Sequence, residues 1–470
     1  MKQASPIPTA SGGLPLLGHI VPLLRAPLGF LVRLPEDGDL VRVRFGPLSA
    51  LVVCDPALLG HVLRDDRTFD KGGALYDRSR EFFGNGLGTC PHGDHRRQRR
   101  LLQPAFHPRR LSAYTPALTA RIAETIGSWQ DGEVLDVVAV MQELTARITI
   151  DTLFSTTPSP AVLDQALGDL NTLLADVIVR TVTPPALDRL PTPRNRRYQQ
   201  ARTRLPRTLH QLVTERRAAG VDHGDLLSMM LTARDPDSGS AEQMLTDDEI
   251  VDQIVSFFGA GTETAASTLA WALHLLGEHP EIEKRLQAEV DSVLAGRPAT
   301  HDDLPRLELT GRIITETLRL WSPAWFFTRM CTADTRLGQY AVPAGTTILY
   351  SQYLLHRQAD LYPDPERFDP DRWAPDHPNP PRREAFIPFG GGARKCIANR
   401  FATSTTVLAL ATIAARWRLQ PLPGTHVRPA VAAVIRPGGL RMRAIARSAT
   451  DAGSHPPAGE DERAEPVDRE

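Results

Sequence analysis

Apolar and polar residues alternate along residues 40–55, on both sides of the pair Gly46-Pro47. Alternation of this kind is typical of a half-buried β-strand, and a Gly-Pro pair favours a turn. We therefore expect a β-hairpin near the start of the chain.

From residue 94 to about residue 325 the pattern is mostly helical, with Pro and Gly at the breaks. Strand patterns return at 340–342, 346–353 and 427–445, and another helix is expected after Cys396. The predicted fold class is mainly α with small β-sheets. We expect a flexible N-terminus over 1–12, a single domain over 13–447 and a disordered acidic tail over 448–470. The last twenty residues carry seven acids and two arginines without apolar periodicity.

The longest predicted helix covers residues 245–277, or 33 residues. Thr246 and Glu249 are spaced as a capping box, which marks a helix start. At 1.5 Å per residue the helix is about 50 Å long, enough to cross a whole domain. Apolar residues recur along it in alternating steps of four and three, which keeps them on one face. The stripe consists of Ile250, Ile254, Phe257, Gly261, Thr264, Thr268, Trp271 and Leu275.

Two members of this stripe are unusual for a core-facing position. Gly261 costs about 1 kcal/mol relative to Ala in a helix interior, and Thr264 places a hydroxyl on the apolar face next to Glu263. One interpretation is structural, with a glycine at a helix crossing and a threonine bonded to its own backbone. The other is a flat groove for a cofactor or ligand, with the acid and the hydroxyl handling protons above it.

Composition narrows the class of protein. The chain has 54 basic and 55 acidic residues, a net charge of -1, which does not favour a nucleic-acid binder. Four scattered cysteines without a CxxC pair argue against a zinc ribbon and a disulfide scaffold. The first apolar stretch is broken by prolines and charges, so neither a signal peptide nor a membrane anchor is predicted. We expect a cytoplasmic protein.

Residues 389–396 (FGGGARKC) carry the most informative pattern. Three glycines allow the backbone to approach a large group closely and to adopt positive φ angles. Arg394 and Lys395 favour the thiolate of Cys396, which is the form that binds a metal. The alternative is an inert buried cysteine in a glycine-rich turn.

The loop resembles the haem-binding loop of the cytochrome P450 family, and other segments resemble that family in the same order along the chain. These segments are His95 to Arg99, Ala260 to Thr264 (the oxygen-activation motif), Glu316 to Arg319 (E-x-x-R), Pro365 to Phe368 with Asp371 to Trp373 (the meander), and Phe389 to Cys396. The loop departs from the family pattern at Ala398, where the family usually has glycine. The resemblance implies the cytochrome P450 fold, with haem b between the long central helix and the cysteine loop.

The resemblance also implies a role for individual residues. Cys396 would be the axial thiolate, Thr264 would hold dioxygen and its water, and Glu263 would supply protons. Glu316, Arg319 and Arg367 would form a buried structural ion pair between helix and meander. The remaining cofactor-binding residues would be His95, Arg99, Ala260, Gly261, Arg329, Phe389, Gly392 and Arg394, of which the histidine and the arginines would contact the haem propionates.

The substrate-facing segments of the family correspond to apolar stretches in this chain. They supply the candidate pocket residues Phe82, Phe83, Phe257, Trp325 and Phe326. This predicts a neutral, hydrophobic and compact substrate, although several of these aromatic residues could be plain core. The amino-acid sequence is most similar to bacterial sesquiterpene-oxidising members of the family, such as pentalenene oxygenases.

That resemblance implies a monooxygenase that inserts one atom of O2 into an unactivated C–H bond, with successive oxidation at one carbon as a further step. No flavin, nicotinamide or ferredoxin pattern is present, so ferredoxin and a NAD(P)H-dependent ferredoxin reductase are the expected electron donors. The alternatives are a fatty-acid or macrolide hydroxylase, a peroxide-driven hydroxylase and a non-catalytic haem sensor. Glu263 and Thr264 argue against the last two.

Overall fold

The computed structural model describes residues 5–155, 159–183, 185–235 and 244–447. The expected acidic tail over 448–470 lies outside these residues. The helices are α1 (Ile20–Arg25), α2 (Pro27–Arg33), α3 (Pro56–Arg64), α4 (Ala74–Phe83), α5 (His92–Leu102), α6 (Pro108–Gly127), α7 (Val137–Leu153), α8 (Pro160–Val182), α9 (Pro193–Ala219), α10 (Leu226–Thr232), α11 (Asp247–Glu278), α12 (Pro280–Leu294), α13 (Glu308–Leu320), α14 (Gln352–Leu355) and α15 (Asn399–Arg416).

The strands are short and form small sheets beside the helices. They are β1 (Leu40–Phe45), β2 (Leu48–Val53), β3 (Phe69–Asp70), β4 (Val134–Asp136), β5 (Phe327–Cys331), β6 (Thr335–Leu337), β7 (Tyr340–Val342), β8 (Thr347–Tyr350), β9 (Trp417–Pro421), β10 (Arg428–Val431), β11 (Ile435–Gly438) and β12 (Arg441–Ala446). The predicted fold class, mainly α with small β-sheets, is confirmed.

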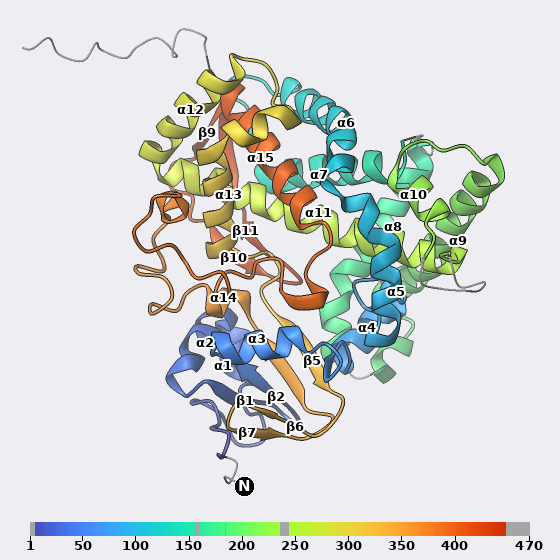
Figure 1. Ribbon diagram of the computed structural model, residues 1–470, viewed down its shortest axis with the longest axis vertical. Coiled ribbons are helices and arrows are strands. Elements are labelled where there is room, and N and C mark those ends of the chain that lie inside the picture. Colours follow the sequence, from blue (N-terminus) through green and yellow to red (C-terminus); the bar gives the residue numbers. More distant parts are fainter. Residues whose placement is uncertain (1–4, 156–158, 184, 236–243, 448–470) are drawn as a thin grey trace, which may run out of the picture.

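The largest sheet has the order β1-β2-β8-β5-β3 and lies at the bottom of Figure 1. The predicted hairpin is its β1-β2 edge, in which Leu40 pairs with Val53. Strand β2 pairs in parallel with β8 through Ala50 and Thr347, although almost 300 residues separate them. The strand expected over 346–353 ends early, because Ser351 caps α14 by accepting a bond from the N–H of Leu354.

Helix α11 crosses the middle of the molecule (Figure 1). Its predicted bounds of 245–277 agree closely with the observed Asp247–Glu278, and the capping box is present. Thr246 Oγ1 accepts a bond from the N–H of Glu249 at 3.1 Å, and the Glu249 carboxylate accepts one from the N–H of Thr246 at 2.9 Å. The main core cluster surrounds α11 with residues of α6, α7, α13 and α15.

Residues 5–12 differ from the flexible segment that we predicted. The N–H of Arg42 donates to Pro8 O at 2.7 Å, and the N–H of Ala10 donates to Arg42 O at 2.9 Å. Ala10 is buried. The segment is therefore an ordered addition to the edge of β1, a contact that the local polarity of the sequence does not indicate.

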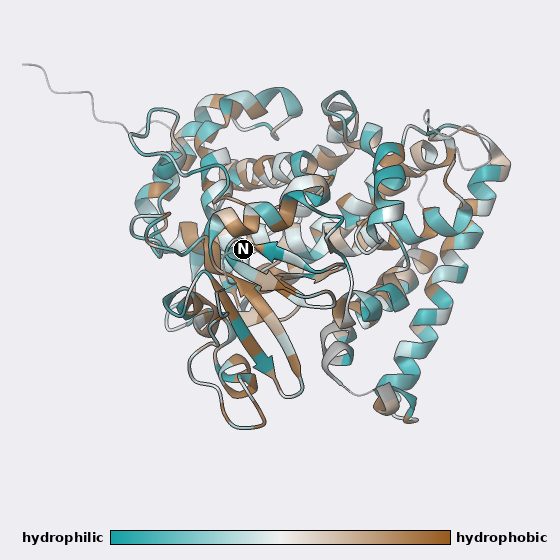
Figure 2. Ribbon diagram, turned by 60° about the horizontal axis from the view of Figure 1, so that its bottom comes forward, coloured by the Kyte–Doolittle hydropathy of each residue, from teal (hydrophilic) through white to brown (hydrophobic). Residues whose placement is uncertain are grey.

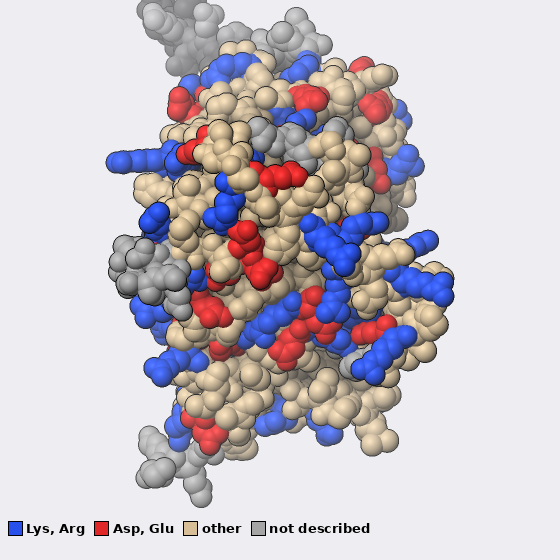
Figure 3. Space-filling model, turned by 90° about the vertical axis from the view of Figure 1, so that its right-hand side faces the viewer, with Lys and Arg blue, Asp and Glu red and all other residues tan. Residues whose placement is uncertain are grey.

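Hydrophobic residues run along the strands of the large sheet, whereas the outer helices carry many hydrophilic residues (Figure 2). Basic and acidic side chains are interspersed on the face shown in Figure 3. Between two of the outer helices, Arg204 of α9 pairs with Asp169 of α8 at 2.5 Å. None of the helices in the described ranges has the length and the apolar character that crossing a membrane requires.

Candidate active site

The cysteine loop is held in a tight conformation in front of α15. The N–H of Cys396 donates to Phe389 O at 2.9 Å. Gly390 and Gly392 have φ angles of 68° and 63°, in the region that favours glycine. A Cβ at Gly392 would also overlap the carbonyl oxygen of Leu63 in α3. These glycines therefore follow from the path of the loop against α3.

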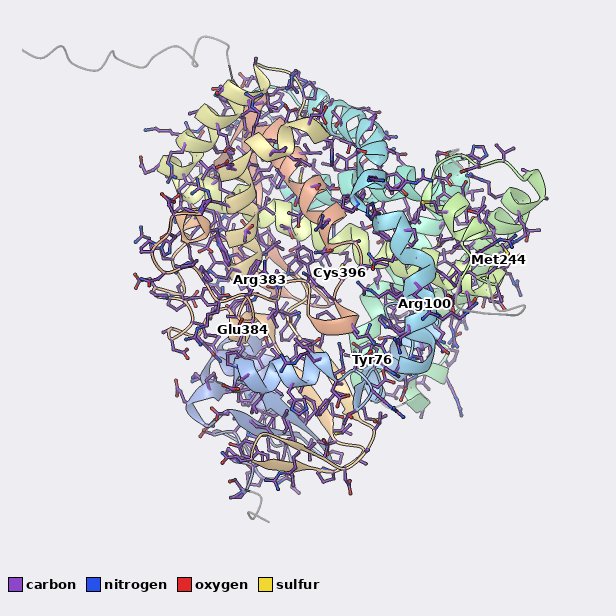
Figure 4. The ribbon with its side chains drawn as sticks, in the orientation of Figure 1. Tyr76, Arg100, Met244, Arg383, Glu384 and Cys396 are labelled. Carbon is purple, nitrogen blue, oxygen red and sulfur yellow. The ribbon has the colours of Figure 1, made fainter. Side chains whose placement is uncertain are left out.

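Cys396 is exposed, yet it lies near the centre of the molecule (Figure 4). Its surroundings raise the pKa of the thiol through desolvation, and the N–H of Ala398 with Arg99, Lys71 and Lys395 acts in the opposite direction. Amide and cationic groups of this kind stabilise a thiolate once a metal binds it. Ala398 has φ -91°, which any L-residue adopts, so its departure from the family glycine causes no backbone strain.

The middle of α11 is less covered than the rest of the helix. Ala260 is exposed, and Gly261, Glu263 and Thr264 are half-buried, whereas residues 265–273 are all buried. An exposed position in the centre of a domain-crossing helix leaves room for a group next to it. The expected groove on the Gly261 face therefore agrees with the burial pattern.

The structural interpretation of Gly261 and Thr264 is also realised. Thr264 Oγ1 donates to Ala260 O at 2.7 Å. A Cβ at Gly261 would lie 3.3 Å from Thr149 Oγ1 of α7, so this glycine lies at a helix crossing. The two interpretations are compatible, because the Thr264 oxygen keeps its lone pairs to accept a bond from water or a ligand.

Burial raises the pKa of Glu263, and Arg436 of β11 opposes this effect. Strand β11 is fixed against the same face of α11, since Ser267 Oγ and Trp271 Nε1 both donate to Ile435 O at 2.5 and 3.2 Å. Sequence reasoning missed Arg436, because nothing in the local pattern links β11 to the acid.

A group of basic residues, which we call the cationic cluster, gathers beside the cysteine loop. It consists of Lys71, His95, Arg99, Arg329 and Arg394. His95 is buried, and its Nδ1 has no hydrogen-bond partner within the described part of the chain. Burial together with Arg394, Lys71 and Arg99 lowers the pKa of His95 to about 3. Burial with Arg329 and Arg394 lowers the pKa of Lys71 to about 7.

The members of the cationic cluster differ in how many of their hydrogen bonds and ion pairs are formed with other protein groups. Arg394 is bound by Asp66 at 3.0 Å, by Asp70 at 2.8 Å and by Cys90 O at 2.8 Å. The structure therefore commits its guanidinium to protein partners rather than offering it to a propionate.

Within the described residues, Lys71, Arg99 and Arg329 donate only to neutral oxygens. Arg99 donates to Lys395 O at 2.6 Å, Arg329 to Tyr76 Oη at 3.2 Å and Lys71 to Gly88 O at 2.6 Å. Lys71 was missed in the sequence, because a lone lysine beyond a short strand carries no motif.

The charge of the cationic cluster fits haem. Among the described residues, Asp66 and Asp70 both pair with Arg394, and Arg99 and Arg329 have no acidic partner, so the three guanidinium groups exceed the paired aspartates in charge. Haem carries two propionate carboxylates, and an accessible cysteine lies next to the cluster. The unpartnered His95 Nδ1 is a further group that a carboxylate would satisfy.

The Glu316–Arg319 cluster lies away from these groups and is saturated. Both side chains are fully buried and are joined by bonds of 2.9 and 2.7 Å. Arg319 also donates to the carbonyls of His356 and Pro365. The prediction for Arg367 was wrong in one respect: its side chain is exposed, and only its carbonyl accepts from Arg319, at 3.0 Å.

The meander side chains that contact Glu316 are Arg372 at 3.5 Å and Trp373 at 2.8 Å. The alternation of exposed and buried residues in this irregular segment could not be derived from its sequence.

The candidate pocket aromatics fall into two groups. The rings of Phe82 and Phe83 are 4.1 Å apart, and Phe257 of α11 belongs to the same apolar cluster. Trp325 instead belongs to the core beside the large sheet, where its Nε1 donates to Ala432 O at 2.9 Å. Phe326 contacts Trp325 with ring centroids 4.5 Å apart. The structure does not bring this second pair together with the first group.

Comparisons with known proteins agree with this geometry. The sequence model of the family described as Cytochrome P450 matches residues 8–440. The chain is 49% identical over 418 residues to cyclooctat-9-en-7-ol 5-monooxygenase of Streptomyces melanosporofaciens, covering 89% of this chain and 90% of that protein. It is 46% identical over 441 residues to pentalenene oxygenase of Streptomyces avermitilis, covering 94% and 97%.

Among solved structures, the haem domain of cytochrome P450DA superposes with a TM-score of 0.85 at 27% identity, covering 95% of this chain and 99% of that one. The cysteine loop, the cationic cluster beside it and these likenesses along the chain lead to one conclusion. The chain belongs to the cytochrome P450 family and is a haem-thiolate monooxygenase with iron protoporphyrin IX as its cofactor.

Proposed function

We propose that residues 13–447 form one catalytic domain that hydroxylates an unactivated C–H bond of a terpenoid in bacterial specialised metabolism, with successive oxidation at the same carbon. The observation that carries this proposal is the likeness of 46–49% over most of the chain to two proteins named for oxidising cyclic terpenoids. The cluster of Phe82, Phe83 and Phe257 beside α11 supports a hydrophobic substrate.

We propose that Cys396 would supply the thiolate that binds the haem iron. Haem supplies the iron that activates dioxygen, and a thiolate ligand favours cleavage of the O–O bond. Lys71, His95, Arg99 and Arg329 would hold the propionates, because these groups are buried or partly buried and lack an acidic partner within the described residues. Arg394 would act indirectly, by fixing Asp66 and Asp70 around the loop.

Glu263 and Thr264 would handle the protons that dioxygen activation requires. Burial raises the pKa of Glu263 and so favours the protonated carboxyl, the form that donates a proton, more than in a free glutamate. The Thr264 proton is committed to Ala260 O, so the hydroxyl would act as an acceptor that positions a water. We expect Thr264→Ala to consume reduced nicotinamide cofactor while product falls and peroxide appears; unchanged coupling would remove Thr264 from the mechanism.

We propose that the enzyme works in the cytoplasm with ferredoxin and ferredoxin reductase, which carry electrons from NAD(P)H. Lys395 and Arg400 are exposed beside the cysteine loop and would attract an acidic partner. Electrostatic steering of this kind weakens as salt is added. Turnover supported fully by added peroxide would instead favour a peroxide-driven hydroxylase.

The deciding experiment is product analysis by mass spectrometry with a surrogate ferredoxin and reductase. The substrate panel contains sesquiterpenes, cyclic diterpenes, fatty acids and macrolides. We expect hydroxylated terpenoids and no products from the other classes. The reduced, carbon monoxide-bound protein should show the red-shifted Soret band of thiolate ligation, and Cys396→Ser should lose it. Products only from fatty acids or macrolides would overturn the terpenoid assignment while leaving the haem assignment intact.

A further inference from the structure

The loop over residues 84–88, which follows α4, is tied to α11 by two side chains. Asp252 Oδ2 accepts a bond from the N–H of Asn85 at 2.7 Å, and Gln253 Oε1 accepts one from the N–H of Leu87 at 2.9 Å. The partners are 167 and 166 residues apart in the sequence, so these bonds exist only in the folded protein. The side chains of α11 thus supply the acceptors that the loop backbone requires.

Gln98 of α5 gives the same loop a second anchor. Its Nε2 donates to Asn85 O at 2.9 Å, and its Oε1 accepts a bond from Gln253 Nε2 at 3.0 Å. The loop therefore stays attached when a single acceptor is removed. A substitution at Asp252 accordingly tests the position of the loop rather than the folding of the domain.

The loop approaches α11 more closely than larger residues would allow. A Cβ at Gly84 would overlap Asp252 Oδ1, and a Cβ at Gly86 would overlap Ser256 Oγ and lie 2.7 Å from Asp252 O. Gly84 also has a φ angle of 62°, in the region that favours glycine. The two glycines therefore let the loop lie directly on a polar side of α11.

That side of α11 continues toward the acid of the oxygen-activation motif. Four of its residues recur in steps of four, three and four and so share one face of the helix: Asp252, Ser256, Gly259 and Glu263. A Cβ at Gly259 would lie only 2.7 Å from Phe83 Cε1. The ring of Phe83 thus lies against the bare backbone of α11, one turn before Glu263.

The place of the Phe83 ring depends on the loop. Phe83 is the last residue of α4, and only Gly84, the C-cap, separates it from Asn85. The ring is half-buried although it belongs to an apolar cluster, so part of it faces open space. A displacement of the bond between Asn85 and Asp252 would therefore move an aromatic wall beside Glu263.

We propose that Asp252 is a positioning residue for the organic substrate. By holding the loop over 84–88 it keeps the Phe83 ring on Gly259, and the ring limits which carbon of the substrate lies near Glu263. This inference rests on the proposed hydroxylase function, but not on the class of the substrate.

Hydrogen exchange of the haem-loaded enzyme measures the attachment of the loop. In Asp252→Ala the N–H of Asn85 loses its charged acceptor, so its exchange should become at least about tenfold faster, the lower limit for a hydrogen bond to a charged group. Asp252→Asn keeps an oxygen that can accept this bond and should restore most of the protection.

The matched control is Asp248→Ala, one turn earlier on α11. The Asp248 carboxylate is exposed and lies 3.2 Å from His210 Nε2, away from the loop. Exchange at Asn85 should stay at the native rate in this variant. Unchanged exchange in Asp252→Ala, or equally fast exchange in Asp248→Ala, would contradict the proposal.

Product analysis tests the position of the Phe83 ring. Asp252→Ala and Gly259→Ala should both shift the ratio of hydroxylated positional isomers, and Asp252→Asn should return it toward the native ratio. Gly259→Ala displaces the ring but leaves the bond to Asn85 in place, so it should shift the products without faster exchange. The ratio is measured on whichever compound of the substrate panel is converted.

The result separates this inference from the terpenoid assignment. An unchanged isomer ratio in both Asp252→Ala and Gly259→Ala, at native haem content, would overturn the proposal and leave the loop as a structural contact. Shifted isomers from a fatty acid or a macrolide, without conversion of any terpenoid, would support the positioning role of Asp252 and overturn only the substrate class.

Discussion

The Glu316–Arg319 cluster and the cationic cluster are both charged and buried, yet they are built on opposite principles. In the first, Glu316 accepts from Arg319, Arg372 and Trp373, and Arg319 donates its remaining bonds to carbonyls. In the second, positive charges outnumber the aspartates, and His95 Nδ1 has no partner in the described ranges. A buried set of charges that is satisfied serves the fold, whereas one that is unbalanced indicates a ligand of the opposite sign.

The largest expected effect comes from breaking the saturated cluster. Glu316→Gln leaves the guanidinium of Arg319 buried without a counter-charge. Removing one partner of a buried pair costs about 3–5 kcal/mol. Urea unfolding of the haem-loaded protein, followed by circular dichroism, measures this free energy. A loss below about 1 kcal/mol, the range of surface pairs, would show that the cluster is not the self-contained unit described above.

Removing one charge from the cationic cluster should stabilise the haem-free protein and weaken the binding of haem. Lys71→Met removes a charge that the folded chain tolerates poorly, so the haem-free protein should become more stable. The haem-loaded protein should release haem faster, by the equivalent of about 1.5–3 kcal/mol for a lost charged hydrogen bond. Haem transfer to apomyoglobin measures the release. Equal destabilisation of both forms would place Lys71 with the structural residues.

The pH dependence of the haem-free protein should separate the two clusters further. The pKa of Lys71 is lowered to about 7 from 10.5, so between these values the unfolded chain binds more protons than the folded one. The free energy of unfolding should therefore rise with pH above 7, by at most about 1.4 kcal/mol per unit. Lys71→Met should lack this slope, whereas Glu316→Gln should keep it. A parallel slope in Lys71→Met would assign the titration to another group.

The smallest effect is expected at an exposed ion pair near the saturated cluster. Arg285 and Asp371 are both about half exposed and are joined at 2.8 Å. Such pairs contribute about 0–1 kcal/mol, and salt screens them. Arg285→Gln should therefore change the urea midpoint little, and less still at high salt. Arg285→Gln is the control for Glu316→Gln. If it lowered the free energy of unfolding nearly as much as Glu316→Gln, the cost would come from disturbing the meander and not from burying an unpaired charge.

Local patterns predicted those parts of the molecule that depend on local physics. The capping box and the apolar stripe placed α11 to within two residues, and the glycines around Cys396 indicated a loop with positive φ angles. Contacts between distant segments were not accessible in this way. Lys71 and Arg436 acquire their surroundings only through folding, and Arg367 could not be distinguished from Arg372 without knowing which side of the meander faces Glu316.

The pairing of β2 with β8 has a consequence for how the chain folds while the ribosome synthesises it. Val53 finds its partner only when Tyr350 has been made, since the two are paired in register. At about 5–20 residues per second this interval lasts roughly 15–60 s. During that time the edge of the first hairpin is open to other chains. Chaperones that cover this edge during synthesis should therefore improve the yield of folded enzyme.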